Sequence, residues 1–224
     1  MTRSEATKEK ILALLYSLSP DERDTLLASV RRIYRFPIHP LEAIFGVSAE
    51  VILEAIHRGT DLTQRGVRGM IAEAVFETDI APKISGWKVI PNISESADFT
   101  FEHQETGSRL TVQIKLQRRE KGVPKRTKDR LHFVVEVQKT RSGVKRGQAS
   151  RPYRFGDFDI LAVCMQPSTG QWTDFHFVAA ERLAPRRGDP KLIEKLQPVP
   201  SPIREPWYNS LSDCLASIHS RGRS

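Results

Sequence analysis

The chain is poor in cysteine, with only Cys164 and Cys214 among its 224 residues. Two cysteines without a metal-binding spacing argue against a zinc cluster and against a disulfide-stapled scaffold. No apolar run approaches the roughly 18 residues that a membrane-spanning helix needs. The start of the chain also lacks the uninterrupted apolar segment of a secretory signal. These absences predict a globular cytoplasmic protein that does not bind membranes.

Acidic residues are scarce in one segment of an otherwise balanced chain. Residues 109–154 contain 15 Lys and Arg but only 3 Asp and Glu, a net charge of +12. The whole chain carries +8, so the remainder is slightly acidic at −4. Positive charge concentrated in this way is expected of a surface that meets a polyanion, and a solvated basic loop is the alternative.

The first 66 residues are expected to form a helical region. Apolar spacing predicts two helices within 5–35, and Ser19-Pro20-Asp21-Glu22 has the pattern of a capping box at the start of the second. Within 41–58, Gly46-Val47-Ser48 resembles the turn of a helix-turn-helix, with Ser48 expected to cap the helix that follows. A purely structural helical hairpin is the favoured alternative, because Glu50 and Glu54 suit a DNA groove poorly.

The rest of the chain mixes strands with helices. A helix is expected at 67–79, and runs rich in Val, Ile and Phe predict strands at 87–91, 97–103, 109–117, 131–139, 157–165 and 171–178. Six prolines between 185 and 206 predict an irregular stretch, followed by a short helix at 207–219. This order predicts an α/β or α+β fold with a core at 67–184 and a proline-rich C-terminal segment at 185–224.

Two of these strands form a hairpin that concentrates polar residues on one face. Apolar and polar residues alternate on both sides of a turn at 105–108, as in half-buried strands. Matching apolar with apolar residues predicts opposed pairs whose numbers sum to 213: Phe99 with Ile114, Phe101 with Val112, Asp98 with Lys115, and Thr100 with Gln113. Asp98, Gln113 and Lys115 should therefore converge on one face.

Such a cluster suits the hydrolysis of a phosphodiester. Mg²⁺ takes oxygen ligands, which Asp98 and the amide oxygen of Gln113 offer. A lysine beside the metal orients or deprotonates the attacking water and neutralises charge in the transition state. An ion pair between Asp98 and Lys115 on a solvated face is the plain structural alternative.

Asp98 followed by Gln113-Ile114-Lys115 resembles the PD-(D/E)xK nuclease superfamily across about residues 67–180. The resemblance implies a restriction-endonuclease-like mixed sheet flanked by helices, and a Mg²⁺ site. Two departures are Ala97 where a proline often stands and Gln113 where the family usually has a carboxylate. The resemblance also implies a glutamate on the preceding helix, where Glu73 stands, as a second carboxylate; Glu136 is the alternative.

The expected function is a Mg²⁺-dependent endonuclease of double-stranded DNA, most simply a type II restriction endonuclease acting as a homodimer. A repair or recombination nuclease of the same superfamily and a non-catalytic helix-turn-helix DNA-binding protein are the alternatives. Phosphate contacts are expected from the basic segment, at Lys139, Arg141, Lys145, Arg146, Arg151 and Arg154.

Overall fold

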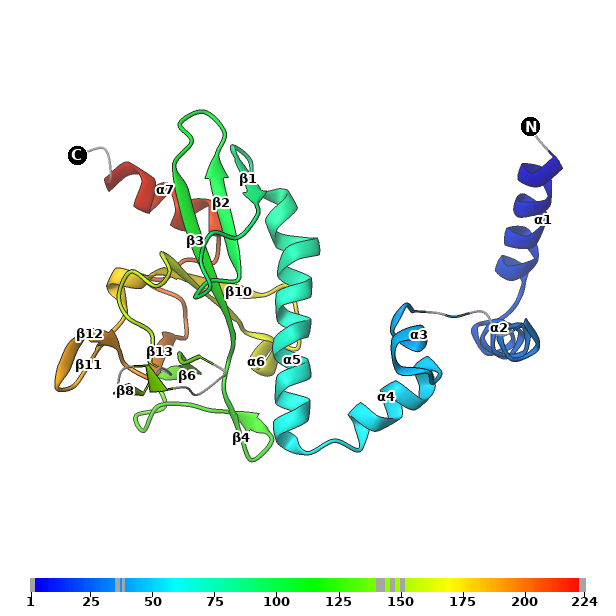
Figure 1. Ribbon diagram of the computed structural model, residues 1–224, viewed down its shortest axis with the longest axis horizontal. Helices are drawn as coiled ribbons and strands as arrows, with labels where there is room; N and C mark the ends of the chain where they lie inside the picture. The colour runs from blue at the N-terminus through cyan, green and yellow to red at the C-terminus, as the bar shows by residue number, and fades with distance from the viewer. Residues whose placement is uncertain are drawn as a thin grey trace. The chain divides into compact units, whose positions relative to one another are not determined.

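The computed structural model describes residues 3–34, 37, 39–139, 144–145, 148–149 and 152–221. The chain forms two compact units, Met1–Gln64 and Arg65–Ser224, which Figure 1 draws together without fixing their relative positions. Within the described ranges, no helix has both the length and the apolar character to span a membrane.

The first unit is helical, as expected. It contains α1 (Arg3–Ser17), α2 (Pro20–Tyr34), α3 (Leu41–Phe45) and α4 (Ala49–His57). The capping box at the start of α2 is confirmed, because the Ser19 N–H donates to Glu22 Oε2 at 3.0 Å and the Glu22 N–H donates to Ser19 Oγ at 3.4 Å.

The turn between α3 and α4 is formed as its glycine predicts, with Gly46 at φ 66°. Ser48 occupies the predicted N-cap position of α4, but its side chain makes no capping hydrogen bond. Glu42 takes that role from the preceding helix, because its Oε1 accepts the Ala49 N–H at 2.6 Å. The carboxylate thereby ties the two short helices together.

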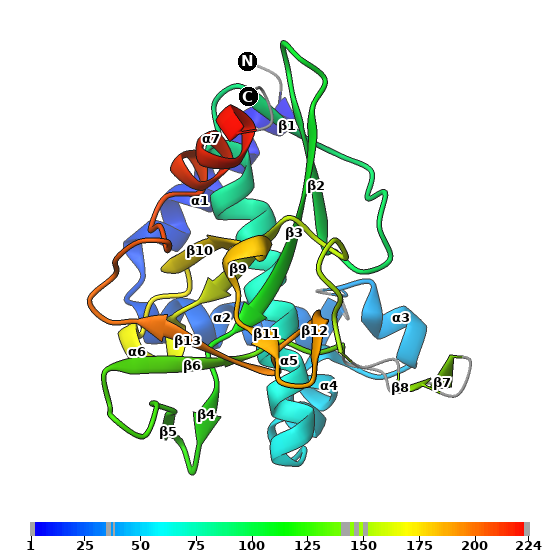
Figure 2. The ribbon, with the colours of Figure 1, turned by 90° about the vertical axis from the view of Figure 1, so that its left-hand side faces the viewer.

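The second unit is built on a five-stranded sheet in the order β1-β2-β3-β9-β10 (Figure 2). Its strands are β1 (Trp87–Ile90), β2 (Phe99–His103), β3 (Arg109–Leu116), β9 (Ile160–Cys164) and β10 (Phe175–Ala179). The β3–β9 pair is parallel and the other three pairs are antiparallel. The expected α+β fold with a mixed central sheet flanked by helices is therefore confirmed.

The predicted register of the β2–β3 hairpin is wrong by two residues. Phe99 lies opposite Val112 and Phe101 opposite Leu110, so opposed numbers sum to 211 rather than 213. The turn is longer than predicted: the His103 N–H donates to Ser108 O at 2.8 Å, which leaves a four-residue loop at 104–107. A shift of two residues keeps every side chain on its predicted face, so alternation does not distinguish the two registers.

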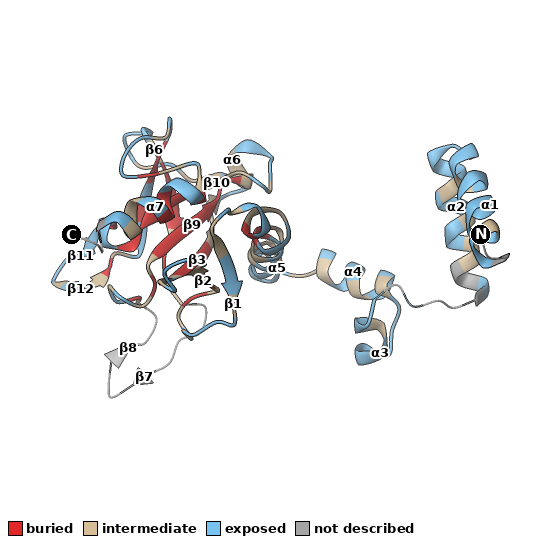
Figure 3. Ribbon diagram, turned by 90° about the horizontal axis from the view of Figure 1, so that it is seen from above, coloured by how far each residue is buried: buried red, intermediate tan, exposed pale blue. Residues whose placement is uncertain are grey.

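Helices cover one face of the sheet. They are α5 (Asp61–Val75), which begins six residues before the expected start and continues into a π-helical turn at Phe76–Ile80, and α7 (Leu211–Arg221). Ala72 and Phe76 belong to the same buried cluster as Ile160 and Ala162 of β9. Figure 3 shows the buried residues concentrated in this sheet and the helix surfaces beside it.

The opposite face is covered by strands rather than helices. β6 (His132–Glu136) pairs antiparallel with β13 (Leu196–Pro200), and both contribute to the buried cluster that includes Leu161 and Val163. The expectation of an irregular stretch at 185–206 is therefore wrong in part, because β11 (Pro185–Arg186), β12 (Asp189–Ile193) and β13 lie within it. A two-stranded sheet has only edge strands, where proline is tolerated.

Smaller elements complete the unit. They are the 3-10 turn η2 (Ala81–Lys83), β4 (Arg119–Glu120), β5 (Val123–Pro124), β7 (Val144–Lys145), β8 (Gln148–Ala149), α6 (Gln166–Thr169) and the 3-10 turn η3 (Ala180–Arg182).

Candidate active site

The candidate site forms where β2 separates from β3. The ladder between them ends with the Asp98 N–H donating to Val112 O at 2.9 Å, while β3 continues to Leu116 with β9 on its other side. Asp98 Oδ2 accepts the Ile114 N–H at 2.7 Å. The carboxylate thus satisfies a backbone donor that a longer β2 would otherwise have paired.

Gln113 is held beside this carboxylate. Its side-chain Nε2 donates to Asp98 Oδ2 at 2.5 Å and lies 3.2 Å from Ile114 O, and its Oε1 accepts the Tyr153 hydroxyl at 3.0 Å. The side chain is only 3% exposed. Because of the two-residue register shift, Gln113 rather than Lys115 is the residue opposite Asp98.

Lys115 lies two residues further along β3 on the same face. Its Nζ is 5.4 Å from the centre of the Tyr153 ring. Burial lowers the pKa of Lys115, and the negative charges of Asp98 and Glu73 act in the opposite direction. The amine is therefore within electrostatic reach of both carboxylates.

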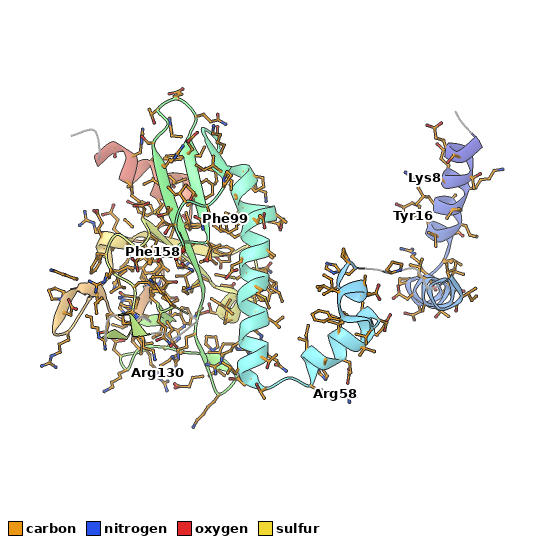
Figure 4. The ribbon with its side chains drawn as sticks, in the orientation of Figure 1. Lys8, Tyr16, Arg58, Phe99, Arg130 and Phe158 are labelled. Carbon is orange, nitrogen blue, oxygen red and sulfur yellow. The ribbon has the colours of Figure 1, made fainter. Side chains whose placement is uncertain are left out.

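Glu73 comes to the site from α5. The neighbouring Ala72 is buried against the sheet, and Phe76 packs against Phe99 with ring centres 5.1 Å apart; Figure 4 shows Phe99 between β2 and α5. Burial raises the pKa of Glu73, the charge of Asp98 raises it further, and Lys115 opposes the shift. The structure therefore brings Glu73, Asp98, Gln113 and Lys115 into one electrostatic neighbourhood.

The charges of this group fit a divalent cation. Burial also raises the pKa of Asp98, although the Ile114 N–H, Lys115 and Gln113 favour its ionised form. Two half-buried carboxylates facing one lysine leave negative charge that a cation would neutralise. Among the described residues, no group of three or more His, Cys, Asp and Glu side chains is arranged to hold a metal. Two carboxylates with an amide oxygen and waters remain a normal donor set for Mg²⁺.

Glu136, the alternative second carboxylate, is engaged elsewhere. It lies on β6 and forms ion pairs with Arg118 and with Lys195, the latter at 3.2 Å. The Gln138 amide also donates to it. These partners already neutralise the Glu136 carboxylate, whereas Glu73 has the charges of Asp98 and Lys115 beside it.

The expected phosphate-binding residues are only partly described. Lys139 forms an ion pair with Asp157 at 3.1 Å, and its Nζ lies 5.3 Å from the centre of the Tyr153 ring, so it borders the site. The Arg154 side chain is exposed. Arg141, Arg146 and Arg151 lie outside the described residues, and for Lys145 the structure describes only the β7 backbone.

Tyr153 is the site residue that the sequence interpretation missed. Its ring is 4% exposed, packs edge-on against Phe158 and lies near both lysines, while its hydroxyl reaches Gln113. Burial raises the pKa of Tyr153, so the hydroxyl stays protonated, donates to Gln113 and is able to accept a hydrogen bond as well. No spacing signal joins residue 153 to the β2–β3 hairpin, because they meet only in the folded chain.

No protein-family model and no curated protein matches the chain. Among solved structures, it is similar to a bacterial homing endonuclease, I-Ssp6803I, with 25% sequence identity over 52% of this chain and 69% of that chain. The TM-score of this match is 0.35.

Proposed function

We propose that the protein is a Mg²⁺-dependent deoxyribonuclease that hydrolyses phosphodiester bonds within double-stranded DNA. The observation that carries this proposal is the meeting of Asp98, Gln113, Lys115 and Glu73 where β2 leaves β3. A plain surface ion pair would not need two carboxylates with raised pKa values beside a half-buried lysine.

The residues divide the chemistry among them. Asp98 and Glu73 supply carboxylate oxygens for the cation, and Gln113 supplies an amide oxygen. When bound, Mg²⁺ would acidify the attacking water and stabilise charge on the phosphate. The lowered pKa of Lys115 suits its amine to accept a proton from that water, and its protonated form neutralises a phosphate oxygen.

We further propose that the protein is a type II restriction endonuclease and that it acts as a homodimer. A duplex has two strands to cut, and two-fold symmetry of the protein supplies two sites. Lys139 and Arg154, with the basic residues between them, would contact the phosphates. A repair or recombination nuclease of the same superfamily is the second candidate, and the substrate preference distinguishes the two.

The test compares the parent protein with Asp98→Asn, Lys115→Gln and Glu102→Gln on plasmid and linear phage DNA, with Mg²⁺ or EDTA. Glu102 is the matched control, because it is a carboxylate on β2 paired with Lys88 and Arg109 away from the site. We expect Mg²⁺-dependent cleavage by the parent and the control, and losses of about 10²–10⁴-fold in the two site variants.

The pattern of products tests the subtype. Discrete fragments from linear phage DNA support a restriction enzyme, whereas preference for branched DNA supports a repair or recombination nuclease. If both site variants cut as well as the parent, the proposed site is wrong.

A further inference from the structure

The strand that carries Lys115 leads within three residues into a strongly basic hairpin. We call residues 118–130, with β4 and β5 at their centre, the basic ribbon. It holds seven Lys and Arg against two Asp and Glu, a net charge of +5 in thirteen residues. Figure 2 shows β4 and β5 as an arm that extends beyond β6. None of the expected phosphate-binding residues at 139–154 belongs to it.

The two acidic residues of the basic ribbon are occupied within it. Glu120 Oε1 lies 3.3 Å from Lys125 Nζ. The Asp129 carboxylate accepts hydrogen bonds from the Thr127 hydroxyl at 2.5 Å and the Leu131 N–H at 2.9 Å. Other cationic side chains, among them those of Lys121, Lys128 and Arg130, are exposed to solvent. The surface of the ribbon is therefore positive.

The base of the ribbon is fixed to the core of the second unit. The Arg118 N–H donates to Val134 O at 2.9 Å, and the Val134 N–H donates to Lys125 O at 3.0 Å. The Arg126 guanidinium lies over the Phe133 ring, 4.0 Å from its centre. An element held in this way loses little conformational entropy on binding a partner.

The tip of the ribbon is a two-residue loop between Glu120 and Val123. Lys121 has φ 50° and Gly122 has φ 81°, as the tight turn of such a hairpin requires. Glycine adopts this conformation more readily than lysine does. Val123 beside this turn is 61% exposed, so the tip presents one cation and one apolar side chain to solvent. The fold alone would be served better by glycine at position 121.

We propose that the basic ribbon enters the major groove of double-stranded DNA beside the phosphate that is cleaved. The major groove admits a two-stranded β-ribbon. The short antiparallel pair of β4 and β5 is such a ribbon. Lys121 would contact a phosphate, and Val123 would meet the thymine methyl groups exposed in the groove. This inference rests on the proposed nuclease function, and the groove-reading element begins three residues after Lys115.

The test measures binding of full-length protein to a labelled duplex in Ca²⁺, by fluorescence anisotropy at several NaCl concentrations. Lys121→Gly removes the charge and relieves the left-handed strain, so the fold is retained. Arg187→Ala is the matched control, because it removes an exposed charge from the turn between β11 and β12. A Val123→Ser variant probes base discrimination.

We expect Lys121→Gly to weaken binding about eightfold in 0.1 M salt and to reduce the salt slope by about one, as for one lost phosphate contact. Arg187→Ala should match the parent protein in DNA affinity and in salt slope. Val123→Ser should leave the salt slope unchanged and broaden the set of cleaved sequences.

A parent that cleaves DNA while Lys121→Gly binds it with unchanged affinity and salt slope would overturn the inference alone. A parent that neither binds nor cleaves DNA would overturn the nuclease assignment together with it.

Discussion

Tyr153→Phe is the substitution that most directly tests how the site is organised. It keeps the buried ring that packs against Phe158 and lies near Lys115 and Lys139, and it removes only the hydroxyl that donates to Gln113 Oε1 at 3.0 Å. Gln113 now directs its Nε2 toward Asp98. To offer an oxygen to a cation beside Asp98, the amide has to turn over, and its Nε2 then needs an acceptor. The Tyr153 hydroxyl serves in either orientation because it both donates and accepts.

The size of the effect of Tyr153→Phe on Mg²⁺ affinity depends on the burial of Gln113, which is 3% exposed. A buried amide left without its partner costs about 1–3 kcal/mol. The cost should be larger in the metal-bound orientation, where an N–H of Gln113 is left unpaired, than in the present one, where only a carbonyl oxygen loses its donor. If the whole cost fell on the metal-bound state, the Mg²⁺ concentration for half-maximal cleavage would rise roughly 5- to 150-fold, and this range is the upper limit of the expected effect. The assays are Mg²⁺ titration of cleavage and Ca²⁺ titration of the protein by calorimetry, which needs no activity.

Combining Tyr153→Phe with Gln113→Glu distinguishes a role of Tyr153 in orienting Gln113 from a purely structural role. In Gln113→Glu the carboxylate offers an oxygen in every orientation, and a hydroxyl donor competes with the cation for it. Adding Tyr153→Phe to Gln113→Glu should therefore leave metal affinity unchanged or increase it. If Tyr153→Phe raises the metal midpoint equally in both backgrounds, or lowers only thermal stability, the positioning role is refuted.

Two further predictions concern polar side chains with little solvent exposure, His176 on β10 and Gln117 directly after β3. Burial lowers the pKa of His176 below 6.5, and the charge of Asp174 opposes this shift. The contribution of the neutral imidazole to stability is therefore complete above about pH 6.5, and it is lost as the pH falls toward the lower pKa of the folded state. The melting temperature of His176→Gln should therefore change less between about pH 7 and 5 than that of the parent protein. His57→Gln, at an exposed histidine, is the control and should behave like the parent. An equal change of melting temperature with pH in all three proteins would contradict the prediction. The Gln117 side chain is 1% exposed, and neither of its amide atoms has a hydrogen-bond partner among the described residues. Gln117→Met should raise the free energy of unfolding by about 1 kcal/mol in urea denaturation, and a destabilised variant would show that the amide is satisfied.

Alternation of apolar and polar residues predicted the faces of β2 and β3 but not their register. Phe101 and Val112 are buried on the helix-covered face, and Gln113 is directed to the other face, as the pattern indicates. The pattern repeats every two residues, so only the loop length decides between sums of 211 and 213. The Thr106 hydroxyl interacts with His103 Nδ1 at 3.2 Å and with Ser108 Oγ at 3.1 Å, and these contacts support the longer loop. Local turn propensity alone did not indicate them.

Residues distant in sequence were harder to place. The family resemblance predicts a glutamate on the preceding helix, and the structure brings Glu73 within the electrostatic influence of Asp98 and Lys115. Tyr153 lies forty positions from Gln113 and has no comparable signal. The proline content of 185–206 also led to the wrong prediction of an irregular stretch where β13 lies. Proline is tolerated in edge strands, and the sequence does not show that β13 is one.

The separation of β2 from β3 makes the backbone and the proposed chemistry depend on the same carboxylate. Because β2 begins only at Phe99, the Ile114 N–H has no strand partner, and this donor is satisfied by Asp98 Oδ2. The late start of β2 also leaves one side of β3 open for Glu73 to approach from α5. Removing the Asp98 side chain would therefore weaken the fold as well as the site, by leaving that N–H unpaired. Asp98→Asn keeps an oxygen acceptor for the Ile114 N–H and removes only the charge, so a stable but inactive Asp98→Asn protein would separate the two roles.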